Sequence, residues 1–298
     1  MSLTLLVDAS SLLYRAYYST PDSVRAPDGS PINAAHGFTN MLARLVSDHD
    51  PSRLACATDE DWRPAWRVGL LPEYKAARVA PAPAQAEADD EVGRQSVPCF
   101  ELLAGLGVAV SGHDGCEAED VIGTLAAREP GPVAIVSGDR DLFSLVEDPR
   151  CWVLYPVRGV TEMVRVDEAE ITRRYKIPGR AYADFAVLRG DPSDGLPGVR
   201  GVGEKTAAAL LERYGSLDAI VKAAGTDPGS GALSRVAAQL DYVERARAVV
   251  NIPTDLPLVD LDLSRPRGEP DARVMERAEA LGLGGAVRRL ADALRGTG

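Results

Sequence analysis

Nine acidic residues fall into five short stretches of the sequence, and their types could support metal chemistry. They are Asp8, Asp59, Glu117, Glu119, Asp120, Asp139, Asp141, Asp191 and Asp194. Carboxylates that lie close together repel one another and raise each other's pKa unless a cation neutralises them. Hard divalent cations prefer oxygen ligands of this kind. If these residues meet in the fold, they predict a site for two metal ions.

Three of the acidic residues stand where apolar, strand-like segments end. Asp8 follows the run 3–7, Asp59 follows the run 54–58, and Asp139 comes just after a third run that ends at Ser137. In an open parallel sheet, the carboxyl ends of the strands border one crevice. We therefore expect these three carboxylates to lie near one another.

Each acidic stretch also has a simpler structural explanation when it is taken alone. The stretch 117–120 could complement a helix dipole, Asp139 and Asp141 could form a turn, and Asp191 with Asp194 could form an Asx turn. These preferences do not explain why acidic residues recur at the ends of three strands and again in pairs. The shared metal site is therefore the favoured interpretation.

The elements that would position these residues alternate between strands and helices. Strands are expected at 3–7, 54–58, 108–110 and 133–136, and helices at 10–18, 34–46, 97–106, 117–128 and 141–146. A β-hairpin is expected from 151–155 and 161–166 at the edge of the sheet. This alternation predicts an α/β fold with a central, mostly parallel sheet and helices on both faces. Short helices broken by Gly and Pro follow, so we expect an α/β domain at 1–178 and a helical domain at 179–298.

Residues 60–96 interrupt the α/β pattern and are too long for a plain connection. The composition also allows a disordered, solvated loop. Aromatic and basic side chains are interleaved in this insertion, namely Trp62, Trp66, Tyr74, Lys75 and Arg78. Such residues suit base stacking and phosphate binding over a crevice, so a functional lid or arch is predicted.

The bulk composition describes a globular chain that is expected in the cytoplasm. The chain has 298 residues, of which 45% are hydrophobic, and no stretch that suits a signal peptide or a membrane span. Four irregularly spaced cysteines argue against zinc fingers and a disulfide framework.

The formal net charge of −11 would ordinarily count against nucleic acid as a partner. If bound metal cancels the acidic cluster, however, local basic residues can still bind phosphates.

A glycine-rich segment between residues 190 and 206 carries a second signal. Gly198 and Gly203 before Lys205 and Thr206 suggest a phosphate-binding loop, but Glu204 separates glycine from lysine and no strand precedes the segment. A helix-hairpin-helix is the better interpretation, because its glycines allow close backbone approach to phosphate and its second helix begins with N–H groups that favour an anion. Such a unit binds the DNA backbone without reading sequence.

At this point the ordered motifs resemble those of a known family along almost the whole chain. They are LLVDASSLLYRAYYS, GFTNML, LPEYKAAR, GCEAEDVIGTLA, VSGDRDLFSLV and LRGDPSDGLPGVRGVGEKTAAALL. The chain resembles the bacterial 5′ nuclease family, which includes the 5′-3′ exonuclease domain of DNA polymerase I, stand-alone 5′ nucleases and, more distantly, the flap endonucleases. It is expected to be a free-standing nuclease. The resemblance implies a PIN-like fold with a helical arch at about 60–96 and a helix-hairpin-helix in the C-terminal domain.

The resemblance also assigns roles to individual residues. It implies that a first metal is held by Asp8, Asp59, Glu117, Glu119 and Asp120, and a second, partly through waters, by Asp139, Asp141, Asp191 and Asp194. Catalytic residues at the base of the arch would be Tyr74, Lys75 and Arg78. DNA contacts would come from Tyr14, Arg15, Arg200, Gly201, Gly203, Lys205 and Thr206. The implied cofactors are two or three Mg²⁺ or Mn²⁺ ions, with K⁺ on the carbonyls of Val199 and Val202.

Two positions depart from the family's usual pattern. Glu119 stands where the family usually has Asp, and the extra methylene moves the carboxylate by roughly an ångström, a shift to which Mg²⁺ should be sensitive. Thr58 stands where an apolar residue usually precedes Asp59. The first departure leaves metal preference open, and the second is interpreted as a packing difference.

The implied function is metal-dependent hydrolysis of phosphodiester bonds by a 5′-3′ exonuclease and 5′ flap endonuclease in replication and repair. Its partner would be DNA with 5′ ends, flaps or nicks, including RNA-primed strands, bound by a monomer. One alternative is a PIN-type ribonuclease, although such domains are shorter and lack the hairpin after residue 196. Another is a non-catalytic DNA-junction binding protein with a degraded site, although all nine acidic positions are occupied by carboxylates. The preference between exonuclease and flap cleavage stays open.

Overall fold

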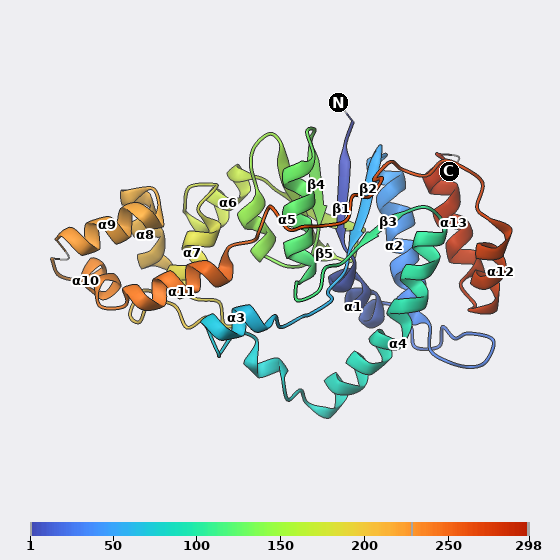
Figure 1. Ribbon diagram of the computed structural model, residues 1–298, viewed down its shortest axis with the longest axis horizontal. Coiled ribbons are helices and arrows are strands. Elements are labelled where there is room, and N and C mark those ends of the chain that lie inside the picture. The colour runs from blue at the N-terminus through green and yellow to red at the C-terminus, as the bar shows by residue number, and fades with distance from the viewer. Residues whose placement is uncertain (1, 228, 297–298) are drawn as a thin grey trace.

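A six-stranded sheet forms the centre of the computed structural model, which describes residues 2–227 and 229–296 (Figure 1). Its strands are β1 (Thr4–Asp8), β2 (Arg53–Ala57), β3 (Ala109–Ser111), β4 (Val133–Val136), β5 (Cys151–Arg158) and β6 (Glu162–Val166). The strand order is β3-β2-β1-β4-β5-β6. Every pair is parallel except β5 and β6, which form the predicted antiparallel hairpin at the edge. The predicted mostly parallel sheet is confirmed.

Successive residues of the central strands enter two different hydrophobic cores. In β1, Leu6 belongs to one cluster of buried side chains, whereas Leu5 and Val7 belong to the other. Because both faces are buried, these strands are continuous apolar runs without polar alternation. The register then brings their carboxyl ends to one edge, with Asp8 opposite Ala57 and Val7 opposite Val136.

Helices cover both faces of the sheet, as predicted. The helix α5 (Ala118–Arg128) contributes to the core that contains Leu6, and the helices α1 (Ala9–Ser19), α2 (Asn33–His49) and α4 (Pro83–Gly105) contribute to the core on the opposite face. After β4, a short 3₁₀ helix, η2 (Asp141–Leu145), replaces the helix expected at 141–146. The result is a three-layer arrangement that leaves the carboxyl edge of the sheet open for a site.

The predicted insertion is built from helices rather than from a structureless loop. It contains α3 (Ala65–Leu70), the 3₁₀ helix η1 (Ala76–Arg78) and the first turns of α4, and it extends away from the sheet (Figure 1). The helix expected at 97–106 is only the second half of α4, which continues through Pro98. Hydrogen bonds from Tyr14 to Asp89 (3.0 Å) and from Tyr18 to Gln85 (3.2 Å) attach the first half of α4 to α1.

The remaining helices lie at two opposite ends of the molecule (Figure 1). One group extends from the β5–β6 side of the sheet and consists of α6 (Glu168–Tyr175), α7 (Tyr182–Arg189), α8 (Glu204–Tyr214), α9 (Leu217–Thr226), α10 (Ala232–Ala237) and α11 (Leu240–Val250). The other group, α12 (Ala272–Ala280) and α13 (Gly284–Arg295), packs near α2 instead.

The position of α13 bears on the predicted helical domain at 179–298. Its apolar residues Val287, Leu290 and Leu294 share a core with Phe38 and Leu42 of α2. Sequence order therefore places α13 with the C-terminal helices, whereas packing places it with the α/β layers. In the part of the chain that the structure describes, we find no helix whose length and hydropathy would suit a membrane span.

Candidate active site

A cleft of about 820 Å³ opens at the carboxyl edge of the sheet. Carboxylates line one part of it, namely Asp8, Asp59, Glu117, Glu119 and Asp139. The insertion lines another part with Trp62, Lys75, Ala77 and Arg78. The strand ends and the insertion therefore bring together residues that are far apart in sequence, as predicted.

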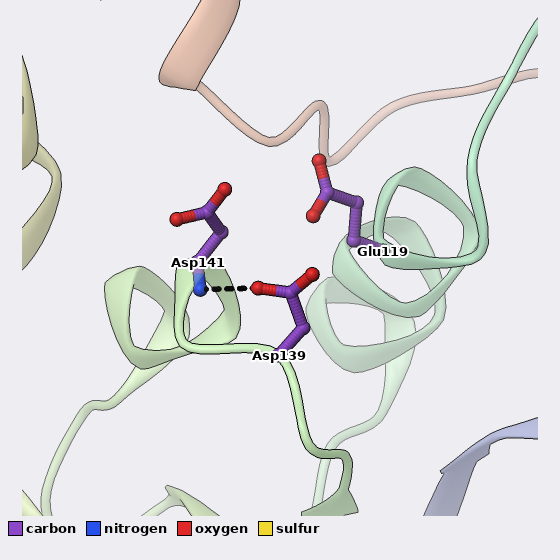
Figure 2. Close-up of side chains that lie close together, drawn as sticks. All are labelled: Glu119, Asp139 and Asp141. Atoms are coloured by element: carbon purple, nitrogen blue, oxygen red, sulfur yellow. Dashed lines mark hydrogen bonds between the residues drawn. The ribbon is translucent and has the colours of Figure 1, made fainter. Parts of the chain in front are cut away.

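Three carboxylates at the centre of this region are close enough to share a cation. Glu119 lies in the first turn of α5, Asp139 lies in the loop after β4, and Asp141 begins η2 (Figure 2). One oxygen from each lies within 4.8 Å of the others. The Asp141 backbone amide donates a hydrogen bond to the Asp139 carboxylate (2.9 Å) and so orients that side chain. Because all three donors are carboxylate oxygens, the group fits a hard divalent cation.

The electrostatics of the cluster also favour a cation. Burial raises the pKa of Glu119, of Asp139 and of Asp141, and the neighbouring carboxylates reinforce this shift at Asp141. Burial, followed by the charge of Asp59, raises the pKa of Asp8 to about 7. Keeping these groups ionised at neutral pH therefore costs free energy that a bound cation would offset.

A buried guanidinium that was not predicted organises the other side of the cluster. Arg67 of α3 is 0% exposed and donates to Glu117 (2.6 Å) and, through two nitrogens, to Asp120 (2.9 and 2.6 Å). It also forms an ion pair with Glu119 (3.0 Å), and its Nε donates to the carbonyl of Val249 in α11 (3.1 Å). Arg67 thus joins the insertion, the acidic helix α5 and the C-terminal helices at one point.

Arg67 changes the interpretation of Asp120. Both oxygens of Asp120 accept from Arg67, and one also accepts from the Glu117 amide (3.0 Å), which closes a capping box at the start of α5. Asp120 is fully buried and does not belong to the set of residues that lines the cleft. Its role as a metal ligand stays a prediction; in this structure its contacts orient α5 and Arg67.

Glu117 is surrounded by donors from the insertion. Besides Arg67, it accepts hydrogen bonds from the Tyr74 hydroxyl (2.6 Å) and from Lys75 Nζ. Tyr74 is 3% exposed and lies outside the lining of the cleft, whereas Lys75 lines the cleft although it is only 5% exposed. Arg78 is about half exposed and reaches Asp194 (2.9 Å) and the Ser193 carbonyl (3.2 Å). Of the three predicted catalytic residues, Arg78 is the one that is open to solvent.

The remaining predicted ligands occupy distinct places around the cluster. Asp59 lines the cleft and accepts from the Ala118 amide (2.7 Å), so it caps α5. The negative charge of Asp194 helps to raise the pKa of Asp141, after burial and Asp139, which places Asp194 beside the cluster. Asp191 instead accepts from Arg189 (3.2 Å) and from the Ser193 amide (3.0 Å) within its own loop.

The loop that carries Asp194 docks directly on the insertion. The Lys75 amide donates to the Asp194 carbonyl (2.9 Å). At Gly195, φ is +73°, and a Cβ atom there would lie 2.1 Å from the Glu73 carbonyl oxygen. Glycine is required for this contact, because any side chain would force the loop and the insertion apart.

Tyr14 and Arg15, predicted to contact DNA, both lie near the cleft. Tyr14 lines it, but its hydroxyl donates to Asp89 of α4. Arg15 lies over Gly138, where a Cβ atom would be 2.4 Å from its Nε. Arg15 is therefore beside the turn that carries Asp139.

The predicted hairpin joins α7 to α8 on the C-terminal side of the molecule. Its outer residues are exposed, namely Arg200, Gly201, Gly203 and Lys205, with Thr206 partly exposed. The carbonyl of Val199 accepts from the Val202 amide (2.8 Å), and both valines are buried. Two residues that were not predicted support the hairpin from below, because Arg235 donates to the Gly201 carbonyl (2.7 Å) and Gln239 accepts from the Arg200 amide (2.9 Å).

Comparisons with known proteins agree with this geometry. Residues 3–176 match the model of the 5′-3′ exonuclease N-terminal resolvase-like domain, and residues 177–271 match the 5′-3′ exonuclease C-terminal SAM fold. A 5′-3′ exonuclease of Streptomyces coelicolor is 48% identical over 97% of this chain and 99% of its own length. A 5′-3′ exonuclease of Mycobacterium tuberculosis is 43% identical over 97% of both chains. DNA polymerase I of Mycobacterium tuberculosis is 40% identical over 85% of this chain but only 27% of the polymerase.

Solved structures resemble the fold over most of its length. The bacteriophage T5 flap endonuclease, in a complex with DNA and metal ions, has a TM-score of 0.69 at 16% identity and covers 98% of this chain and 99% of its own. Human GEN1 bound to Holliday junction DNA has a TM-score of 0.65 at 14% identity, covering 98% of this chain and 71% of its own. At such identities the likeness concerns the fold alone, so family membership depends on the sequence matches. These matches span both halves of the chain, which shows that it belongs to the 5′-3′ exonuclease family and is a 5′ nuclease.

Proposed function

We propose that this 5′ nuclease uses two divalent cations, Mg²⁺ or Mn²⁺, to cleave DNA at free 5′ ends and at 5′ flaps. The cluster of Glu119, Asp139 and Asp141, of which Glu119 and Asp139 line the cleft, carries the proposal, because its oxygens lie within 4.8 Å of one another and their pKa values are raised. Asp8, Asp59, Glu117 and Glu119 would serve one ion, and Asp139, Asp141 and Asp194 the other. Asp191 would act through water and Asp120 through Arg67.

Bound divalent cations supply an activated water and stabilise the charge of the attacking and leaving oxygens in an in-line displacement. The chain's own contribution is to position the phosphate. Arg78 is exposed on the wall of the cleft, and its guanidinium would bind a phosphate oxygen beside the acidic cluster. Lys75 donates to Glu117, so its positive charge limits the repulsion that the carboxylates exert on an incoming phosphate. Tyr74 supports Glu117 from below through its hydroxyl.

The hairpin would hold the duplex on the other side of the cleft. Exposed Arg200 and Lys205 would contact the DNA backbone, while Gly201, Gly203 and Thr206 would allow close approach of phosphate to backbone N–H groups. The Val199 and Val202 carbonyls would bind K⁺. Tyr14 and Arg15 would contact DNA near the cleft, and the strand could be DNA or an RNA-primed DNA. A monomeric state and a cytoplasmic location stay predictions.

The two alternative functions fit the structure less well. A PIN-type ribonuclease has no need of the hairpin after residue 196, which here directly follows the loop whose Asp194 and Gly195 contact the insertion. A non-catalytic junction-binding protein has no need of a buried carboxylate cluster whose ionisation costs free energy. Both features favour a DNA nuclease.

Cleavage-site mapping on matched flap, nicked and blunt DNA substrates tests the proposal directly. We expect cleavage with Mg²⁺ or Mn²⁺ and none with chelator, and we expect products cut near the junction on the flap and at the 5′ end on the other substrates. Cleavage that persists in chelator, or that starts at 3′ ends, would contradict it. The same mapping on an RNA-primed flap measures the preference for the 5′ strand.

A further inference from the structure

The insertion brings three aromatic side chains near the active site, and their surroundings differ. Tyr74 is 3% exposed, and its hydroxyl is held by Glu117. Trp66 lies outside the lining of the cleft and stacks with the Arg67 guanidinium, whose carbon is 4.5 Å from the ring centroid. Trp62 lines the cleft and is 44% exposed. Of these three rings, Trp62 is therefore the one placed to contact a molecule in the cleft.

The backbone on each side of Trp62 is anchored. The Asp61 amide donates to the Cys116 carbonyl (3.1 Å), which ties this segment to the loop before α5. The Arg63 side chain donates to the carbonyls of Tyr74 (2.7 Å) and Pro72 (2.9 Å), and its amide donates to Asp61 (3.0 Å). The backbone that carries Trp62 is thus held in place, and its ring is exposed. A rigid aromatic surface loses little entropy when a planar ligand stacks on it.

The groups around Trp62 match the two parts of a nucleotide. Trp62 lines the same cleft as the carboxylates Asp8, Asp59, Glu117, Glu119 and Asp139, where a cation would sit, and as Arg78. A strand whose phosphate lies between these charged groups would carry its base a few ångströms to one side. An exposed indole accepts any base there, because every nucleobase has a π-face.

We propose that Trp62 stacks on a nucleobase of the cleaved strand beside the scissile phosphate and so positions that strand for hydrolysis. This inference rests on the proposed function, because it takes the cleaved strand of a 5′ nuclease as the occupant of the cleft. Trp62 is a positioning residue that acts without base preference. Tyr74 cannot take this role in the described structure, because its ring is buried and its hydroxyl is engaged.

Equilibrium binding of a 5′-flap DNA with Ca²⁺ in place of Mg²⁺ gives the first measurement, with gels to verify that the DNA stays uncut. We expect Trp62→Ala to weaken binding about tenfold and Trp62→Phe by about threefold, the range of base–aromatic stacking. Trp152→Phe is the matched control, because Trp152 lies in β5 against Arg165. This variant should bind the DNA like the wild type.

Fluorescence separates stacking from a structural effect. The chain has three tryptophans, so Trp66→Phe/Trp152→Phe leaves Trp62 as the only reporter and Trp62→Phe/Trp66→Phe leaves Trp152. Flap DNA should quench the first protein and leave the second unchanged. Thermal melting of each variant verifies that the fold is intact.

A scan with single abasic nucleotides identifies the stacked base. In the wild type, removing the base at one position beside the scissile phosphate should lower the affinity about tenfold. In Trp62→Ala, removing the same base should lower the affinity less than about twofold, as expected when the base and Trp62 are the two partners of one interaction. Wild-type affinity in Trp62→Ala, or a loss that is equal at every abasic position, would overturn the inference.

Failure of the proposed function has a different signature. If the wild type cleaves no flap, nick or blunt end with either metal, the nuclease proposal fails. An abasic effect that depends on Trp62 at one position, together with quenching of Trp62, would still support Trp62 as a DNA contact. The absence of both results would overturn the proposed role of Trp62 as well.

Discussion

At the scale of single residues, the active site is a balance between buried carboxylates and the few cations that face them. Arg67 pairs with Glu117, Glu119 and Asp120, and Lys75 pairs with Glu117. Asp139 has the negative charge of Asp194 and the positive charges of Lys75 and Arg78 as neighbours, whereas the charges that act most on Asp141 are those of Asp139, Asp194 and Glu119. The negative charge is therefore least compensated around Asp141, where a divalent cation would be held most strongly.

Glu119 stands where the family usually has Asp, and its carboxylate faces two different groups. Its carboxylate pairs with Arg67 (3.0 Å), and one of its oxygens lies within 4.8 Å of both Asp139 and Asp141. We expect Glu119→Asp to raise cleavage with Mg²⁺ more than cleavage with Mn²⁺, because Mg²⁺ tolerates displaced ligands less well. Rates with both metals at saturating substrate measure the difference.

Equal changes with both metals, or no change with either, would contradict this prediction about Glu119. They would mean that the longer side chain reaches the ion equally well or acts through a water. Glu101→Asp, which makes the same change at an exposed position of α4, is the control and should leave both rates unaltered.

The carboxylates were predictable from sequence, whereas Arg67 was not. Asp8, Asp59 and Asp139 follow buried apolar runs, so their meeting at one edge follows from parallel strands alone. The partners of Arg67 are 50, 53 and 182 residues away in the sequence. Nothing local distinguishes this arginine from its neighbours in the insertion, and its pairing depends on how three elements pack.

At the scale of elements, the acidic helix α5 is fixed at both of its ends. Asp59 accepts from its first amide, Arg67 holds its first turn through Asp120, and Glu129 follows its last residue. The position of Glu119 is therefore set by the helix as a whole. Disturbing either end should alter both stability and metal binding.

We expect Arg67→Met to lower the free energy of unfolding by about 3 kcal/mol or more at neutral pH, because it leaves buried carboxylates without their partner. Chemical denaturation with chelator present measures the loss. Added divalent cation should recover part of it by neutralising the same carboxylates. Arg44→Met is the control, since Arg44 forms an exposed pair with Asp48 that should contribute less than about 1 kcal/mol. A cost at Arg67 no larger than at Arg44 would contradict the organising role.

Glu129 gives a pH-dependent test at the other end of α5. It accepts from Thr4 (2.6 Å) and from Arg53 (2.8 and 3.0 Å), which links α5 to β1 and β2. Burial would raise the pKa of Glu129, but these hydrogen bonds outweigh burial and leave the pKa below its ordinary value of 4.5. Because the folded-state pKa is the lower one, the stabilisation is present above about pH 4.5 and is lost as pH falls through the folded-state pKa.

Glu129→Gln should therefore cost about 1–2 kcal/mol at pH 7 and much less near pH 3. Denaturation at both pH values gives the comparison, and Glu279→Gln, in an exposed pair with Arg288, is the control. A cost that is the same at both pH values would mean that the charge of Glu129 is not what stabilises the fold.

The elements themselves were predicted with unequal success. The strands and α5 match because buried apolar runs and an acidic first turn are local signals. The first half of α4 was predicted only through the family resemblance, as part of a helical arch, because its sequence is mostly polar. It contacts the rest of the protein through buried Ala88 and Val92 and through hydrogen bonds from Tyr14 and Tyr18. The return of α13 to α2 could not be read from sequence order, since it depends on a complementary apolar face far away in the chain.

At the scale of the whole molecule, the net charge of −11 would repel DNA, which is itself a polyanion, unless the charge is distributed unevenly or neutralised. Part of the negative charge lies in the cleft, where cations would cancel it, and the hairpin presents Arg200 and Lys205 to solvent. The molecule would therefore hold the duplex at the hairpin and the cleaved strand at the cleft. Each contact can be tested separately.

We expect Lys205→Ala to weaken duplex binding equally for all sequences and to reduce the salt dependence of affinity by about one unit of slope, as for one lost phosphate contact. Affinity measured across a salt series gives the slope. Lys222→Ala, an exposed lysine of α9, should leave the slope unchanged. Losses that differ among sequences of the same structure would indicate base reading instead.

The most direct test of the central claim is single-turnover cleavage of a 5′-flap DNA by Asp139→Asn in Mg²⁺, with DNA affinity measured in parallel. Asp139 belongs to the carboxylate cluster, so the substitution should abolish cleavage while binding stays intact or tightens, because one charge that repels phosphate is removed. Asp255→Asn, at an exposed position outside the cleft lining, should cleave like the wild type. Substantial turnover by Asp139→Asn with unchanged metal occupancy would contradict the account.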